Sequence, residues 1–263
     1  MMLAIDPAAA GRRLQQDGWL VLEGVIPGDL VTSLRADVFA AWDICRAIQE
    51  RNGVAHDADL TVHHLVGLRP SFLEALVAME PLDPVITAYF GGKYILNSLG
   101  GAINRSGHAS YAQRIHRDIR SYSGDLPLLL NTLVMLDDFR PDNGATWLYT
   151  RGHRLAEKPL QDDFDRHAEQ ALGAAGSVLI FDSNLWHSGG FNASDAPRVS
   201  ITPMFCRPFV KPQFDYPRAL GYDDGERFSP YLRQIIGYNS RIPATLDEWY
   251  QPPERRMYRP DQG

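Results

Sequence analysis

Four residues in the middle of the chain have the types that a non-haem iron site requires. His116 and Asp118 stand two positions apart in the segment IHRD, and His187 follows later in LWHSGG. Two histidines and one carboxylate can occupy one face of an iron octahedron and leave the other positions open for a co-substrate and O₂. Arg198 can hold a carboxylate of 2-oxoglutarate through two parallel hydrogen bonds. This combination predicts an oxygenase.

The spacing of His116 and Asp118 predicts that both side chains point the same way. We expect residues 113–118 to form a strand, in which positions two apart project from one face. An H-x-D pair alone is a weak signal, because such a short pattern also occurs by chance. His187 strengthens it, since a strand and a polar turn precede this residue and two glycines follow it closely. The alternative is that His187 is a hydrogen-bonded core histidine and His116 a surface residue.

Arg198 begins a segment that alternates between polar and apolar residues. Over residues 198–205 this alternation predicts a strand with Arg198 and Ser200 on one face and Val199 and Ile201 on the other. The hydroxyl of Ser200 would then add a hydrogen bond to a carboxylate held by Arg198. The alternative is that Arg198 forms a surface salt bridge on an edge strand.

Composition limits the class of protein. A chain of 263 residues with 44% hydrophobic and 22% charged residues can bury a large core, and we expect a single domain over residues 1–263. The net charge of −6 provides no basic surface, so nucleic acid is not an expected partner. We expect Cys45 and Cys206 to be reduced core thiols. No segment reads as a signal peptide or a membrane span, so a cytoplasmic protein is expected; its oligomeric state stays open.

Hydrophobic periodicity predicts a mainly β protein with flanking helices. Helical patterns over 30–45 and 71–90 define an N-terminal helical support at residues 26–90, interrupted by a polar loop at 53–70. A β core is expected at about 94–208, followed by an irregular tail at 209–263 that wraps the core. Strands are expected at residues 17–25, 94–99, 113–118, 128–136, 177–181, 186–188 and 198–205.

Several longer motifs occur together and resemble one family. They are DGWLVLEGVIP near the start, QRIHRD at 113–118, LDDFRPDNGAT at 136–146, RGHR at 151–154, SVLIFDSNLWHSGGFN at 177–192 and RVSITP at 198–203. Together they resemble the phytanoyl-CoA dioxygenase family of Fe(II)/2-oxoglutarate-dependent oxygenases. The resemblance implies a cupin-like double-stranded β-helix, or jelly roll. It also implies His116, Asp118 and His187 as the iron ligands and Arg198 as the anchor of 2-oxoglutarate.

The same resemblance implies further residues near the co-substrate. Gln113 matches a glutamine beside the metal-chelating end of 2-oxoglutarate, although strict strand alternation would place it opposite His116 unless a bulge intervenes. Thr146 resembles a threonine that contacts the co-substrate; alternatively, it stabilises the bend at residues 143–144. His153 matches a histidine whose part in the family is structural.

The implied reaction oxidises a C–H bond of a small molecule while 2-oxoglutarate and O₂ become succinate and CO₂. Hydroxylation is favoured over halogenation, because halogenating relatives replace the carboxylate ligand with a small residue and Asp118 is present here. Two alternatives stay open. One is a jelly-roll metal enzyme that does not use 2-oxoglutarate, and the other is a non-catalytic module that binds a small molecule.

The sequence does not define the substrate. Arg120 and Tyr122 follow Asp118 in phase with the metal-facing positions, so Arg120 is a candidate partner for an anionic substrate group. A solvated loop arginine is the alternative. Loops on a rigid scaffold usually supply specificity, which makes further residues candidates for the pocket or its lid. These are His63, His64, Arg105, His108, Trp249 and Tyr250.

Overall fold

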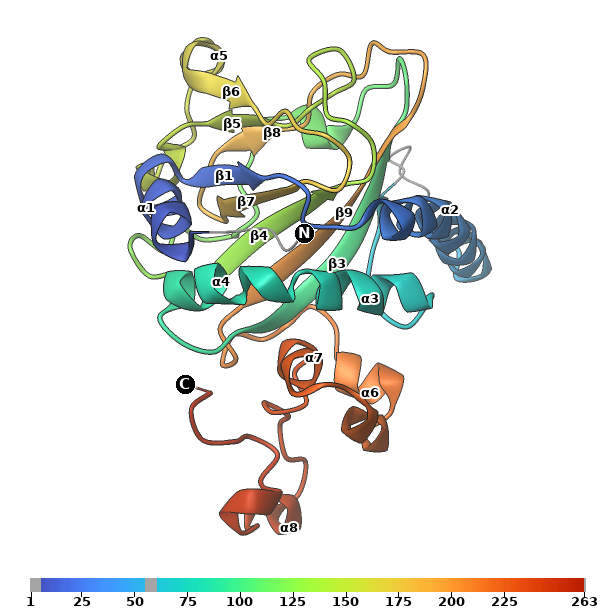
Figure 1. Cartoon of the computed structure of the whole chain (residues 1–263), viewed down its shortest axis with the longest axis vertical. Coiled ribbons are helices and arrows are strands. Elements are labelled where there is room, and N and C mark those ends of the chain that lie inside the picture. The colour runs from blue at the N-terminus through green and yellow to red at the C-terminus, as the bar shows by residue number, and fades with distance from the viewer. Residues whose placement is uncertain (1–5, 55–60, 263) are drawn as a thin grey trace.

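Two antiparallel sheets form the centre of the computed structural model, which describes residues 6–54 and 61–262 (Figure 1). Within these residues the larger sheet has six strands, in the order β1-β7-β4-β9-β3-β2, and the smaller sheet has three, in the order β6-β5-β8. The strands are β1 (Trp19–Leu22), β2 (Thr61–Val62), β3 (Ile95–Asn104), β4 (Leu129–Met135), β5 (Trp147–Tyr149), β6 (Ala168–Gln170), β7 (Val178–Asp182), β8 (His187–Ser188) and β9 (Arg198–Cys206). The expected jelly roll is confirmed.

Alternation along the strands of the larger sheet builds a core on each of its faces. Leu133 of β4 and Leu179 of β7 point inward and pack with Leu148 of the smaller sheet. Their neighbours Val134 and Ile180 belong to a second core on the outer face of the larger sheet. Because successive side chains of a strand project to opposite faces, one apolar run supplies both cores.

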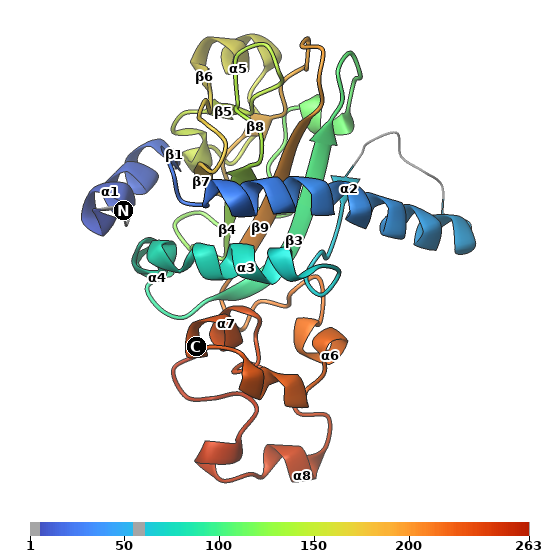
Figure 2. The same cartoon turned by 45° about the vertical axis from the view of Figure 1, so that its right-hand side comes forward.

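Helices of the N-terminal third cover the outer face of the larger sheet, as Figure 2 shows for α2, α3 and α4. Helices lie within the range 26–90 that we expected to form a helical support, but the helical pattern over 71–90 is divided into two helices. The proline-containing turn Glu80–Leu82 separates them, since proline cannot continue the hydrogen bonding of a helix. The helices are α1 (Pro7–Asp17), α2 (Gly28–Arg51), α3 (Pro70–Ala78) and α4 (Asp83–Phe90).

The C-terminal segment differs from the irregular wrapping tail that we expected. It forms α6 (Tyr216–Leu220), α7 (Pro230–Ile235) and α8 (Leu246–Trp249), and it lies at the end of the molecule away from the smaller sheet (Figure 1). Tyr216, Leu232 and Ile235 are buried in the outer core, whereas α8 lies beyond it. Apolar residues at helical spacing therefore cap one end of the sheet instead of surrounding it.

Two further expectations concern the thiols and the membrane. Cys45 and Cys206 are free, and burial raises the pKa of Cys206 to about 12, so this thiol stays protonated and unreactive at neutral pH. No helix in the described ranges has the length and apolar character needed to cross a bilayer. Residues 55–60 of the expected polar loop lie outside the described residues, and the short strand β2 lies within the remainder of this loop.

Candidate metal centre

His116 and His187 are joined through their backbones. Each amide N–H donates to the carbonyl oxygen of the other residue at 2.9 Å, and the imidazole centroids lie 4.2 Å apart. The expected strand over residues 113–118 is wrong: a 3₁₀ turn occupies Tyr111–Gln113, and His116 makes only an isolated bridge to β8. The two imidazoles are brought together by this bridge between distant segments.

Asp118 completes the cluster. Its Oδ1 lies 3.7 Å from Nε2 of His116, and its Oδ2 lies 3.7 Å from Nε2 of His187. One ligand atom from each of the three residues lies within 4.8 Å of the others. Two imidazole nitrogens and one carboxylate oxygen around a common point make a donor set that suits a divalent transition metal.

Surrounding groups fix the orientation of these side chains. Nδ1 of His116 lies 2.7 Å from the carbonyl oxygen of Arg114, and Nδ1 of His187 lies 3.0 Å from that of Leu185. Since a carbonyl only accepts, each Nδ1 carries the hydrogen and each Nε2 presents its lone pair to the cluster. Burial lowers the pKa of His187, against the opposing charge of Asp118, and so favours the neutral, ligating imidazole.

Asn131 is a site residue that the sequence did not single out. It is buried in the middle of β4, and its Nδ2 donates to Oδ2 of Asp118 at 2.6 Å. Its own Oδ1 accepts from the hydroxyl of Ser183 at 3.4 Å. The sequence could have indicated Asn131 through its position, an amide side chain within the apolar run of residues 128–136. A buried polar side chain on a central strand needs a specific hydrogen-bond partner.

Arg198 and Ser200 present unused polar atoms to the same region. Arg198 is 6% exposed, yet its Nε and Nη1 have no hydrogen-bond partner in the described part of the chain, and the same holds for Oγ of Ser200. The guanidinium stacks over Phe139, with Cζ 4.1 Å from the ring centroid. Burial lowers the pKa of Arg198 to about 10, so it remains charged at neutral pH. A buried cation with free donors is a site prepared for an anion.

A cavity of about 280 Å³ connects these groups. Its walls include most of the residues proposed for the site: His116, Asp118, His187, Arg198, Ser200 and Thr146. The structure therefore brings the predicted metal ligands and the predicted anion-binding pair to one space between the two sheets. Thr146 is buried at the cavity wall, which fits the predicted contact with a co-substrate.

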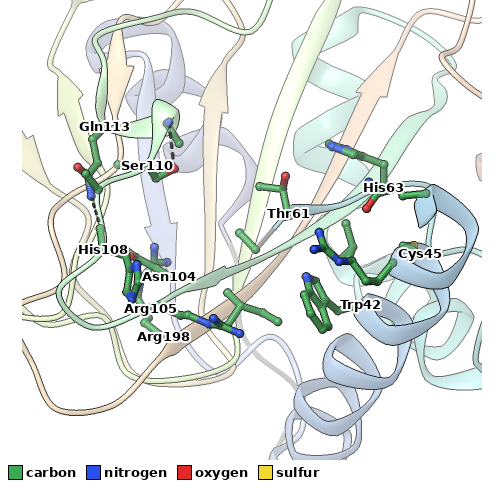
Figure 3. A pocket seen from close by; sticks show the side chains of 18 of the residues that line it. Trp42, Cys45, Thr61, His63, Asn104, Arg105, His108, Ser110, Gln113 and Arg198 are labelled. Carbon is green, nitrogen blue, oxygen red and sulfur yellow. Dashed lines mark hydrogen bonds between the residues drawn. The ribbon is translucent and has the colours of Figure 1, made fainter. Parts of the chain in front are cut away.

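Gln113 lies in a second cavity, of about 540 Å³, which adjoins the first (Figure 3). Its Nε2 donates to the carbonyl oxygen of His108 at 3.3 Å, and it is not in the wall around the three clustered residues. The geometry thus does not support contact of Gln113 with the metal-chelating end of 2-oxoglutarate. The 3₁₀ turn that ends at Gln113 determines the direction in which its side chain points.

Arg120 and Tyr122 do not point into either cavity. The phase argument for them fails because no strand continues beyond Asp118. The hydroxyl of Tyr122 donates to the carbonyl oxygen of Arg154 at 3.1 Å, and Arg120 is an exposed loop residue. Both are absent from the walls of the two cavities, so neither is supported as a substrate-binding residue.

The remaining candidates divide into two groups. His63 lines both cavities, and Arg105 and His108 line the second. His64 instead stacks on Phe214, with centroids 4.7 Å apart, and so fastens the C-terminal segment. The other tail and motif residues also lie away from the metal cluster: Trp249 and Tyr250 are exposed at α8, and His153 packs beneath Gly18 beside α1.

A jelly roll with two histidines and an aspartate clustered between its sheets defines the class of cupin-like metal-binding proteins. Within this class, the profile of the phytanoyl-CoA dioxygenase (PhyH) family matches residues 14–200, and the chain belongs to that family. The metal cluster, Arg198 and Ser200 all fall within the matched segment. The chain is therefore a member of a dioxygenase family.

Relatives of this chain include uncharacterized proteins and proteins named as dioxygenases. An uncharacterized protein of Mycobacterium tuberculosis is 37% identical over 153 residues, which cover 58% of this chain and 56% of that protein. The chain thus spans little more than half the length of that relative. The dioxygenase cdmA of Talaromyces verruculosus is 28% identical over 249 residues, covering 87% of this chain and 82% of the relative.

Solved structures share the fold. AviO1 from Streptomyces viridochromogenes superposes with a TM-score of 0.60 and 21% identity, covering 81% of this chain and 99% of that one. EctD from S. alaskensis, in its apo form, gives a TM-score of 0.62 at 18% identity, with 78% and 79% covered. At these identities the likeness concerns the jelly-roll fold.

Proposed function

We propose that this protein is an Fe(II)/2-oxoglutarate-dependent oxygenase that hydroxylates a C–H bond of a small molecule. The observation that carries the proposal is the shared cavity, where a His-Asp-His cluster lies beside a buried arginine with unused donors. Membership of a dioxygenase family supports the oxygenase class.

In this proposal His116, Asp118 and His187 hold the iron. The imidazoles offer Nε2 atoms whose tautomer is set by backbone carbonyls, and Asp118 offers Oδ1 while Asn131 hydrogen-bonds Oδ2. Bound Fe(II), with 2-oxoglutarate and O₂, would supply the oxidising chemistry. The retained carboxylate of Asp118 favours hydroxylation over halogenation.

Arg198 and Ser200 bind the carboxylate of 2-oxoglutarate that lies away from the metal. A guanidinium can donate two parallel hydrogen bonds to a carboxylate, either from Nε and Nη2 or from its two Nη atoms. Nε and Nη1 of Arg198 are unpaired among the described residues, and Oγ of Ser200 can donate a third hydrogen bond. Phe139 restrains the guanidinium plane by stacking on it. Thr146 in the cavity wall adds a hydroxyl next to the bound co-substrate.

The test is an anaerobic titration of the metal-free protein with Fe(II) and then with 2-oxoglutarate, followed by optical absorption. We expect Fe(II) to bind and 2-oxoglutarate to add a weak visible charge-transfer band. Admission of O₂ should then release succinate, which requires iron. Iron binding should be lost in His116→Ala and Asp118→Ala and retained in His167→Ala, which removes an exposed histidine of α5 (Gln161–His167).

Each alternative predicts a different result. Bound iron without the band would indicate a metal enzyme that does not use 2-oxoglutarate, and turnover would then survive Arg198→Ala. No iron binding by the wild-type protein would indicate a non-catalytic binding module. Either result would overturn the proposed function.

A further inference from the structure

The second cavity is open to solvent and continuous with the metal cavity. Figure 3 shows its two walls: Trp42, Cys45, Thr61 and His63 on one side, and Asn104, Arg105 and His108 on the other. We call this space the outer cavity. Several residues line both cavities: Thr61, Val62, His63, Ala102, Ala112, Gly189 and Arg198. A molecule in the outer cavity therefore borders the site of the proposed reaction.

Among the described residues, the charged side chains that line the outer cavity all have one sign. Arg46, Arg105 and Arg198 line it, and no Asp or Glu among the described residues does so. This is notable in a chain whose net charge is −6. His63 and His108 add imidazole groups to the lining, one on each wall. The local field therefore favours an anion, although the protein as a whole repels one.

The three arginines are not equivalent. Arg198 belongs to the metal cavity, where the proposed function uses it. Nε of Arg46 lies 3.4 Å from Oε1 of Glu50, so a carboxylate already compensates this charge. The side chain of Arg105 forms no hydrogen bond or ion pair with any described residue. Arg105 is therefore the uncompensated cation at this wall.

The backbone that carries Arg105 is held in place. Nδ2 of Asn192 donates to the carbonyl oxygen of Asn104 at 2.8 Å, and the amide of Gly107 donates to the carbonyl oxygen of Asn192 at 2.9 Å. These bonds fasten both sides of Arg105 to the loop that follows β8. A fixed backbone lowers the entropy cost of placing the guanidinium on a ligand.

The outer cavity also has apolar and aromatic residues in its lining. Trp42 of α2, Val62 of β2 and Ile103 of β3 line it. The volume of about 540 Å³ is in the range of small-molecule sites. A cation on one side and an indole on the other match a ligand with an anionic group at one end and an apolar body.

We propose that the substrate of this enzyme carries a carboxylate or phosphate group, which Arg105 binds in the outer cavity while Trp42 contacts the apolar part. This proposal rests on the proposed function for the reaction itself. Arg105 then orients the substrate so that its other end reaches the metal cavity past Ala112 and Gly189.

Quenching of Trp42 fluorescence tests the proposal without iron or 2-oxoglutarate. Iodide is an anionic quencher and acrylamide a neutral one, and the signal of Trp42 is the difference between the wild type and Trp42→Phe. We expect Arg105→Gln to reduce iodide quenching of Trp42 about twofold at low salt, since one unit charge in the same cavity contributes a factor of that order in water. Quenching by acrylamide should not change.

Controls and added anions complete the experiment. Arg166→Gln, on exposed α5, should leave both quenchers unaffected. Inorganic phosphate and acetate are then compared at matched ionic strength: protection from iodide by phosphate alone indicates a phosphorylated substrate, and protection by acetate indicates a carboxylic acid. Equal iodide quenching in the wild type and Arg105→Gln, with no protection by either anion, would overturn the proposal. Because no metal is present, that failure would leave the proposed function untouched.

Discussion

His116 and His187 pair reciprocally, with each amide N–H donating to the other's carbonyl oxygen at 2.9 Å. In an antiparallel pair, residues directly opposite each other project their side chains to the same face. The pairing therefore fixes both imidazoles on one side, and a shift of one residue would turn one of them away. Two backbone hydrogen bonds thus make the imidazoles of two segments that are far apart in the sequence point toward the same metal site.

Asn131→Ala should lower the affinity for Fe(II) by about 10- to 100-fold, as is usual when a group that orients a metal ligand is removed. The amide of Asn131 donates to Oδ2 of Asp118 at 2.6 Å and so holds the carboxylate in one orientation. The measurement is an anaerobic Fe(II) titration. Asn97→Ala is the matched control, because it removes another buried strand amide, bonded to the carbonyl oxygen of Lys211. Equal affinities in the two variants would contradict the positioning role.

Arg198→Lys should weaken 2-oxoglutarate binding while Fe(II) still binds normally. A lysine ammonium keeps the charge but cannot reproduce the planar fork or the stacking on Phe139. The loss of one hydrogen bond to a charged group corresponds to about 1.5–3 kcal/mol, or roughly 10- to 150-fold in affinity. Titration of the iron-loaded variant with 2-oxoglutarate measures this change. Arg207→Lys controls for the substitution, since Nε of Arg207 donates to the backbone carbonyl oxygen of Pro127 and Arg207 lines neither cavity. Unchanged affinity in Arg198→Lys would place the co-substrate elsewhere.

The motifs of the sequence were sufficient to predict the jelly roll and the grouping of His116, Asp118 and His187. Such motifs are recognised by the types of the ligands and their order in the chain, which do not depend on the local conformation. Local conformation was predicted less well. Alternation suggested a strand through Gln113, but Ser110 caps a 3₁₀ turn there by accepting from the amide of Ala112. The alternation of polar and apolar residues reveals neither a side-chain cap nor a bridge to a distant strand.

Asn131 and Arg105 show the complementary limit. The sequence named Arg105 among several loop candidates for the pocket and did not single out Asn131, and the role of each depends on what the fold places opposite it. The partner of Asn131 is Asp118, and the wall facing Arg105 includes Trp42. Such relationships depend on tertiary contacts that composition and spacing do not encode.

His64 should make the stability of the metal-free protein depend on pH. Burial lowers the pKa of His64, mainly by desolvation and with a smaller contribution from His63. The unfolded chain then takes up a proton below about pH 6.5 while the folded chain does not. Stability is therefore complete above that pH and declines as the pH falls towards the lower, folded-state pKa.

His64→Asn isolates this contribution, because asparagine tolerates the positive φ of 58° at this position. The wild type should be more stable near pH 7.5, owing to the stacking on Phe214. The difference in unfolding free energy between the two proteins, from urea titrations, should shrink below pH 6.5. A difference that stays constant with pH would show that His64 titrates normally in the folded protein.

Gly190→Ala should destabilise the protein by about 1–3 kcal/mol through overpacking. A Cβ at this position would lie 2.5 Å from the carbonyl oxygen of Ala145 and 2.9 Å from the carbonyl carbon of Gly144. Both are backbone atoms and cannot rotate away. The glycine is thus required because two chain segments pass close together at the wall of the outer cavity, rather than by direct contact with a ligand.

Gly11→Ala is the matched control for Gly190→Ala. Gly11 lies inside α1, and an added Cβ would meet no atom within 4 Å. Alanine should therefore stabilise the protein here by about 0.5–1 kcal/mol, because it restricts the unfolded chain and favours the helix. Thermal and urea unfolding of both variants measure the two changes in unfolding free energy, which should have opposite signs. A Gly190→Ala protein as stable as the wild type would mean that the chain around residues 144 and 145 can move aside without cost.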